Sequence, residues 1–128
     1  GGNNVAIGSG ALLVATTAAD NTAIGTLALT ANTSGTDNTA VGYAAGDAVT
    51  TGSDNTLIGD NAGGALTTGD FNTAIGSGAL ITQTTASYNT AVGYLSLTAN
   101  TTGNANVGLG ESTQTRQAQE IRQWEEMH

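Results

Sequence analysis

The chain has 128 residues, a length that fits a single domain, and 38% of them are hydrophobic while only 4% are aromatic. Much of the apolar share is Ala, so a broad globular core would lack large side chains, whereas a narrow structure lined by small residues would not. Lys is absent and the only Arg residues are Arg116 and Arg122, which leaves a formal net charge of -8. Because phosphate binding relies on clusters of Lys and Arg, we expect no nucleic acid partner.

Other residue types exclude further classes of protein. The 19 Gly residues do not recur at every third position, so the chain is not collagen-like. There is no Cys to form disulfides or thiolate metal sites. The longest apolar run, 11–15, is far too short to cross a bilayer, so we expect no membrane insertion. Low charge with abundant Thr, Asn and Gly is typical of an extracellular surface or a virion, and Gly1 in place of Met indicates a fragment or a processed product.

One motif, Asn-Thr-Ala-Ile/Val-Gly with small variations, recurs every 17 residues without an insertion or deletion. Its first residues are Asn4, Asn21, Asn38, Asn55, Asn72, Asn89 and Asn106. Three residues further on stand Ile7, Ile24, Val41, Ile58, Ile75, Val92 and Leu109, each followed by Gly. Seven copies at a fixed period are the signature of a repeat architecture.

Two more stripes complete the repeating unit. An Ala-Leu stripe includes Ala11-Leu12, Ala28-Leu29 and Ala79-Leu80, and a Thr stripe includes Thr16-Thr17, Thr50-Thr51 and Thr101-Thr102. Short β-branched segments between Gly and Asn predict strands of about five residues joined by tight turns. A helix is excluded because Gly and Thr recur in every long window. We therefore predict an all-β fold over 1–110, a parallel β-solenoid with one 17-residue unit per coil and a length of about 29 Å.

The columns of this solenoid receive distinct roles. We expect the column from Ile7 to Leu109 to fill the narrow interior as its core, and the following Gly to adopt positive φ. The Asn residues are expected to form a structural ladder by bonding to the backbone and to the next coil. A 17-residue coil cannot bury both this Ile/Val column and the Ala-Leu stripe. One of them should therefore face outwards as an apolar strip that identical chains cover.

Several copies of the motif resemble a known class of repeat. The residues that carry this resemblance are Asn21-Thr22-Ala23-Ile24-Gly25, Asn38-Thr39-Ala40-Val41-Gly42-Tyr43 and Asn89-Thr90-Ala91-Val92-Gly93-Tyr94. They are similar to the head repeat of trimeric autotransporter adhesins and to repeats of phage and viral tail fibres, over residues 3–110. The resemblance implies a left-handed parallel β-roll in which three chains pack around a common axis. The unit here is longer than the usual head repeat, so the resemblance does not fix the shape of the coil or its handedness.

From Glu111 onward Gly and Asn disappear, and the composition predicts a short helix over 111–128. Two ion pairs at i,i+4 favour it, Arg116 with Glu120 and Arg122 with Glu126. Alternating spacings of three and four relate Gln114, Gln117, Ile121, Trp124 and His128. This pattern leaves two alternatives open, the start of a trimeric coiled coil and a helix that caps the last coil.

Residues for catalysis are scarce. The only His is His128, and there is no Cys, no Lys and no Glu before Glu111, so triads, thiol catalysis and zinc sites are excluded. Four carboxylates remain for a two-acid glycosidase, and we interpret them as solvated turn residues: Asp47, Asp54, Asp60 and Asp70. The sequence predicts no enzyme and no cofactor.

Three further patterns suggest binding. Asp20, Asp37 and Asp54 share a column suited to Ca²⁺, but this column continues as Phe71, Tyr88 and Ala105, so we predict no metal site. Thr-rich stripes of this kind suit an ice-binding face, although structural hydroxyl ladders are the preferred interpretation. Tyr43 and Tyr94 also share a column, about 14 Å apart, and are candidate contacts to a receptor or glycan.

Taken together, these features predict a homotrimeric attachment fibre, the head or shaft of a phage tail fibre or bacterial surface adhesin. The alternative is an ice-binding β-solenoid that uses the Thr column.

Overall fold

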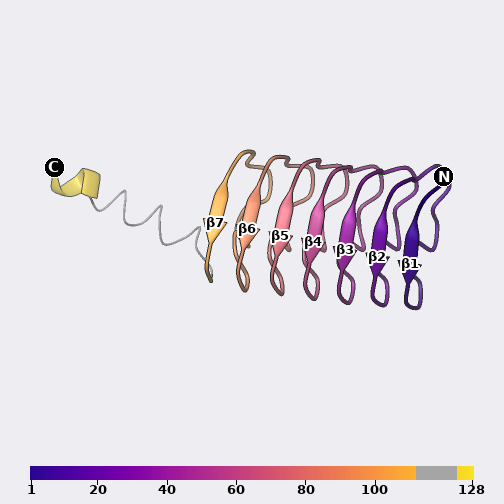
Figure 1. Cartoon of the computed structure of the whole chain (residues 1–128). Helices are drawn as coiled ribbons and strands as arrows, with labels where there is room; N and C mark the ends of the chain where they lie inside the picture. Colours follow the sequence, from indigo (N-terminus) through magenta and orange to yellow (C-terminus); the bar gives the residue numbers. More distant parts are fainter. Residues whose placement is uncertain (112–123) are drawn as a thin grey trace.

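The computed structural model describes residues 1–111 and 124–128, and residues 1–111 wind into a solenoid with one short strand in each coil (Figure 1). The strands form a single seven-stranded sheet in chain order. They are β1 (Val5–Ile7), β2 (Thr22–Ile24), β3 (Thr39–Val41), β4 (Thr56–Ile58), β5 (Thr73–Ile75), β6 (Thr90–Val92) and β7 (Val107–Leu109). The predicted all-β parallel solenoid with 17-residue coils is confirmed.

Each strand pairs in parallel with the same strand of the next coil. In β2 and β3, for example, Ala23 lies opposite Ala40 and Ile24 opposite Val41. This register repeats from β1 to β7, so residues 17 positions apart lie above one another along the whole sheet. We number the coils 1 to 6 from the asparagines that open them, Asn4 to Asn89.

The strands have three residues rather than the expected five, because the backbone turns at both ends. The residue before each ladder Asn has a φ between 57° and 63°, and the Gly after each of the first six strands has a φ between 126° and 134°. At these positive φ values the backbone is no longer extended, so the strand ends there. The Thr-rich segment forms no strand within the described residues. It is nevertheless bonded between coils, as from Thr33 N to Thr50 O at 3.0 Å and from Thr50 N to Thr67 O at 2.9 Å.

The interior of the solenoid is lined by small residues and by Leu. The middle residue of each of the five central strands is fully buried: Ala23, Ala40, Leu57, Ala74 and Ala91. The Ala-Leu stripe is buried as well, with Ala28, Leu29, Ala79 and Leu80 at 0% exposure. This stripe, and not the Ile/Val column, therefore occupies the core.

The expectation that the Ile/Val column forms the core is wrong. Its seven members lie on the outer side of the strands: Ile7, Ile24, Val41, Ile58, Ile75, Val92 and Leu109. The reason is the alternation of side chains along a strand. The ladder Asn points inwards to make its hydrogen bonds, so the residue two positions later also points inwards, and the residue three positions later points outwards.

Core volume is conserved between neighbouring coils. Coil 4 carries Leu57 where the other strands have Ala or Gly, and coils 3 and 4 carry Gly46 and Gly63 where other coils have Leu. A Cβ added to Gly46 would lie 2.6 Å from a Leu57 methyl group, and one added to Gly63 would lie 2.8 Å from the other methyl. The large side chain of Leu57 thus occupies space that Leu residues fill elsewhere.

The described part of the C-terminal segment is short. Residues 124–127 form one helical turn, in which the Trp124 ring stacks on His128 with centroids 4.6 Å apart. The rest of the helix expected over 111–128, and with it the choice between coiled coil and cap, lies outside the described residues.

Candidate functional site

The Asn ladder runs through the whole solenoid. In each coil the side-chain amide of the ladder Asn donates to a carbonyl 14 residues later, as from Asn55 Nδ2 to Gly69 O at 2.9 Å, and this bond closes the coil. The side-chain oxygen accepts the backbone N–H of the next ladder residue, as Asn55 Oδ1 does from Asn72 N at 2.9 Å. From Asn21 to Asn89 these residues are at most 1% exposed. Each amide therefore joins the ends of its own coil and links that coil to the next.

The Gly that ends each strand has a second reason to be Gly. A Cβ added to Gly59 would lie 2.6 Å from the carbonyl carbon of Gly76, its equivalent in the next coil. Gly25 and Gly42 are similarly close to the backbone of their successors. The coils approach one another so closely at this corner that no side chain fits between them.

The outer face of the sheet carries two parallel rows of side chains. One is the Ile/Val column, whose members in β2, β4, β5 and β6 are 36–37% exposed although packed between neighbours. The other, the outer Thr row, consists of Thr22, Thr39, Thr56, Thr73 and Thr90, with Val5 and Val107 at its ends. No position of either row carries a charge, and these Thr hydroxyls form no hydrogen bond with any described residue. This face repeats regularly from β1 to β7.

The Thr stripe on another side of the coil behaves differently. Its first Thr donates its hydroxyl to the carbonyl of the equivalent Thr in the next coil, at 2.9 Å from Thr16 to Thr33 and at 3.1 Å from Thr67 to Thr84. Thr33 and Thr50 make the same bond. These hydroxyls form a structural ladder, whereas the second Thr of each pair, such as Thr17, Thr51 and Thr68, is exposed and its hydroxyl bonds to no described residue.

The acidic residues do not converge. Asp20, Asp37 and Asp54 are exposed in one column, and Asp47, Asp60 and Asp70 occupy three others. The described residues contain no group of three or more His, Cys, Asp or Glu side chains that could hold a metal ion, and they enclose no pocket. Desolvation by burial raises the pKa of Asp47, and hydrogen bonds from its own backbone N–H and that of Ala48 partly oppose this rise.

The two candidate receptor contacts stay apart. Tyr43 and Tyr94 are exposed, at 55% and 56%, but they lie in coils 3 and 6 with Asp60 and Ser77 between them in the column. The structure does not bring the two rings together.

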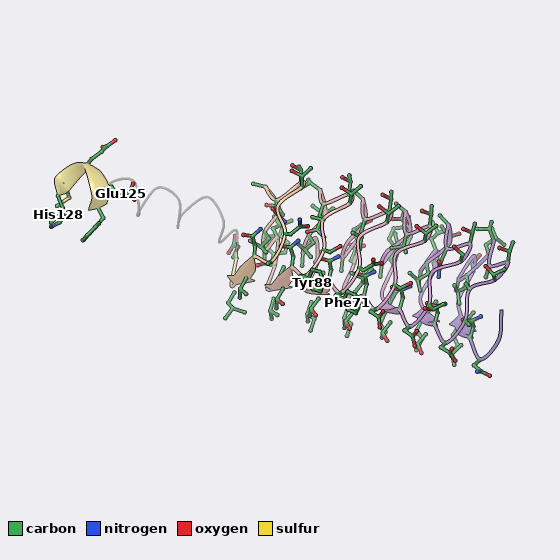
Figure 2. The ribbon with its side chains drawn as sticks, turned by 90° about the horizontal axis from the view of Figure 1, so that it is seen from above. Phe71, Tyr88, Glu125 and His128 are labelled. Atoms are coloured by element: carbon green, nitrogen blue, oxygen red, sulfur yellow. The ribbon has the colours of Figure 1, made fainter. Side chains whose placement is uncertain are left out.

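A different aromatic pair was missed by the sequence reasoning. Phe71 and Tyr88 lie in neighbouring coils with ring centroids 5.2 Å apart and planes inclined by 7° (Figure 2). The signal for this pair was present in the 17-residue register, which places the two residues one coil apart in a single column.

Among the described residues, no helix is both long enough and apolar enough to cross a membrane. Comparisons with models of protein families, with curated proteins and with solved structures found no match to this chain.

Proposed function

We propose that this chain is a non-enzymatic structural protein, a segment of a homotrimeric attachment fibre such as a phage tail fibre or a bacterial surface adhesin. The proposal is carried by one observation, the uncharged Ile/Val column that runs along the outer face of every strand. Its function would be to give length and rigidity to an attachment organelle on a virion or cell surface, where the fibre meets a receptor or glycan. The resemblance to adhesin head repeats and tail-fibre repeats supports the same conclusion.

Leaving this apolar column in water costs free energy that a contact between copies would recover. Complete burial of an Ile or Val side chain stabilises by about 1.5 to 3 kcal/mol, so covering an exposed third contributes on the order of 0.5 to 1 kcal/mol. The column repeats this gain in each coil and in each chain. A continuous apolar strip with a regular repeat fits an identical strip on another copy, because the spacing of the two is the same.

Three copies around one axis would bury all three columns against each other with cyclic symmetry. The outer Thr row lies beside the column and would border the contact. Neither row brings a charge into it, so no buried carboxylate would have to be neutralised.

The test is the mass in solution, measured by multi-angle light scattering at several concentrations. A trimer gives three times the 12.6 kDa mass of the chain. A mass of one chain throughout would overturn the assembly and, with it, the fibre.

A second candidate, an ice-binding solenoid, is favoured by a specific observation. The outer Thr row and the Ile/Val column place hydroxyl and methyl groups at the strand spacing of about 4.8 Å, and the hydroxyls have no partner among the described residues. This surface is distinct from the Thr stripe considered from the sequence, in which the first Thr of each pair bonds to the next coil.

The two candidates need the same face and are therefore mutually exclusive. Thermal hysteresis together with a single-chain mass would support ice binding. A threefold mass without hysteresis would support the fibre.

A further inference from the structure

The stacked pair of Phe71 and Tyr88 has no evident role in the fold. The rings are 49% and 62% exposed, and they stack on each other outside the solenoid (Figure 2). No member of the column that contains them belongs to the hydrophobic core. The pair therefore contributes little to burial, and it follows three Asp residues in its column, Asp20, Asp37 and Asp54.

Backbone conformation does not explain the aromatic residues either. Phe71 has a φ of 58° and Tyr88 a φ of 63°, and every member of this column is left-handed. Asp occupies the same position in coils 1, 2 and 3, and Asp tolerates this conformation far better than a bulky residue does. Two adjacent aromatic residues at strained positions are a reason to look for a function.

Polar groups beside the rings are held in place. Asp70 Oδ1 accepts the backbone N–H of Ser53 at 2.8 Å, and Asn104 Oδ1 accepts that of Ser87 at 2.8 Å. The second carboxylate oxygen of Asp70 and the amide N–H groups of Asn104 have no partner among the described residues. The free acceptor of Asp70 belongs to coil 4, directly before Phe71, and the free donor of Asn104 belongs to coil 6, directly before Ala105.

The stack is open at one end. The column continues after Tyr88 as Ala105, whose methyl group is too small to cover the next position. A flat ligand could extend the stack over Ala105, against the free side of Tyr88 and within reach of Asn104. At the other end the neighbour of Phe71 is Asp54.

Charge restricts the class of ligand. Residues 1–111 contain no Lys or Arg, and Asp54 and Asp70 lie beside the pair, so phosphates and anionic sugars would be repelled. A neutral sugar ring has an apolar face for the Tyr88 ring and hydroxyls that can accept from Asn104, the combination typical of small-ligand sites. We propose that Tyr88, backed by Phe71 and flanked by Asn104, stacks on a neutral pyranose of a glycan. This inference rests on the proposed attachment function for its biological meaning only.

The test uses saturation-transfer difference NMR on the intact protein with maltotetraose, cellotetraose, mannotetraose and chitotetraose as probes. We expect weak binding of at least one of them, with a Kd on the order of 1 mM. Phe71→Asp and Tyr88→Asp introduce the residue that the column already holds at Asp54, so the fold should be retained. Tyr88→Asp removes the stacking face and should weaken binding by about tenfold or more, and Phe71→Asp, which removes the ring behind Tyr88, should weaken it less.

The matched control is Tyr43→Ser, which removes an equally exposed but isolated ring and introduces the residue found at that position in coil 5. It should leave sugar binding unchanged. Absence of binding to all four sugars, or an equal loss in Tyr43→Ser, would overturn the site. A lower oligomeric mass in Phe71→Asp would also overturn it, because the pair would then be a contact between copies. If the wild type binds sugar but has the mass of a single chain, the fibre proposal is wrong and the sugar site stands.

Discussion

At the scale of single residues, the ladder asparagines do the most for this fold. Each of the buried ones uses its amide in both directions, towards its own coil and towards the next. Asn suits this position because a short side chain with a donor and an acceptor on one carbon reaches both coils at once. No aliphatic residue could replace these bonds.

Replacing Asn55 by Ala should therefore be strongly destabilising. Asn72 N and Gly69 O would lose their partner inside the solenoid, and each buried group left unpaired costs about 1 to 3 kcal/mol. Chemical denaturation followed by circular dichroism measures the change. Asn4→Ala is the comparison, because Asn4 is only partly buried at the end of the ladder and should cost less. An equal, small effect at both positions would show that the ladder is not a main source of stability.

The stability of the fold should depend on pH through Asp47. Burial raises its folded-state pKa above the ordinary Asp value of 3.8, so ionisation is harder in the folded state than in the unfolded state. The resulting loss of stability is absent below that value, grows as the pH rises through the interval up to the raised pKa, and is constant above it. Asp47→Asn should thus raise the melting temperature at pH 7 and have little effect at pH 3.

Thermal melts of the two proteins across this pH range test the expectation. Asp37→Asn, in an exposed column, corrects for the general effect of removing one negative charge from an acidic chain. If both substitutions change stability equally at every pH, burial of Asp47 has no part in it.

At the scale of the coil, the packing of Leu57 against Gly46 and Gly63 shows how one unit adapts to the next. The coil keeps its length of 17 residues. A larger residue on the strand, Leu57, is matched by smaller residues on the neighbouring turns, Gly46 and Gly63. Interiors packed to crystal-like density require this kind of compensation, because neither a void nor an overlap is tolerated without cost.

A double-mutant cycle at Leu57 and Gly63 tests this compensation. Gly63→Leu should overlap with Leu57 and destabilise by about 1 to 3 kcal/mol. Leu57→Ala should cost about 2 to 5 kcal/mol through the cavity that it leaves. The double variant restores the arrangement of coils 2 and 5, Ala on the strand with Leu on the turn, and should be more stable than the sum of the single effects predicts. Strict additivity would contradict direct packing between the two positions.

At the scale of the whole molecule, the outer face of the sheet raises the question of assembly. An Asp at Ile58, in the middle of the Ile/Val column, would introduce a charge into any contact between copies, where its desolvation is costly. Ile58→Asp should reduce the light-scattering mass from three chains to one while the circular dichroism spectrum of the solenoid is retained. Leu13→Asp is the control, because Leu13 is 71% exposed in a column that already carries Asp47. A threefold mass in both variants would place the contact elsewhere.

Sequence and structure agree on the coarse architecture for a physical reason. A period of 17 residues kept through seven motifs without a single shift allows only one regular solution, in which equivalent residues stack and every strand pairs with its successor. The glycine corners and the Asn ladder follow from the same register. The length of the strands did not follow, because the left-handed residue before each Asn has no single residue type and includes Asp, Phe, Tyr and Ala.

What the sequence by itself determined is therefore the repeat, the parallel pairing and the columns. Only the tertiary structure decided which columns lie inside. Residue type favoured Ile and Val for the interior, but the buried amides of the ladder set the alternation of each strand, and the narrow coil has room for Ala beside them. The apolar column was thereby left outside, and the contact between Phe71 and Tyr88 likewise arose only when the coils were stacked.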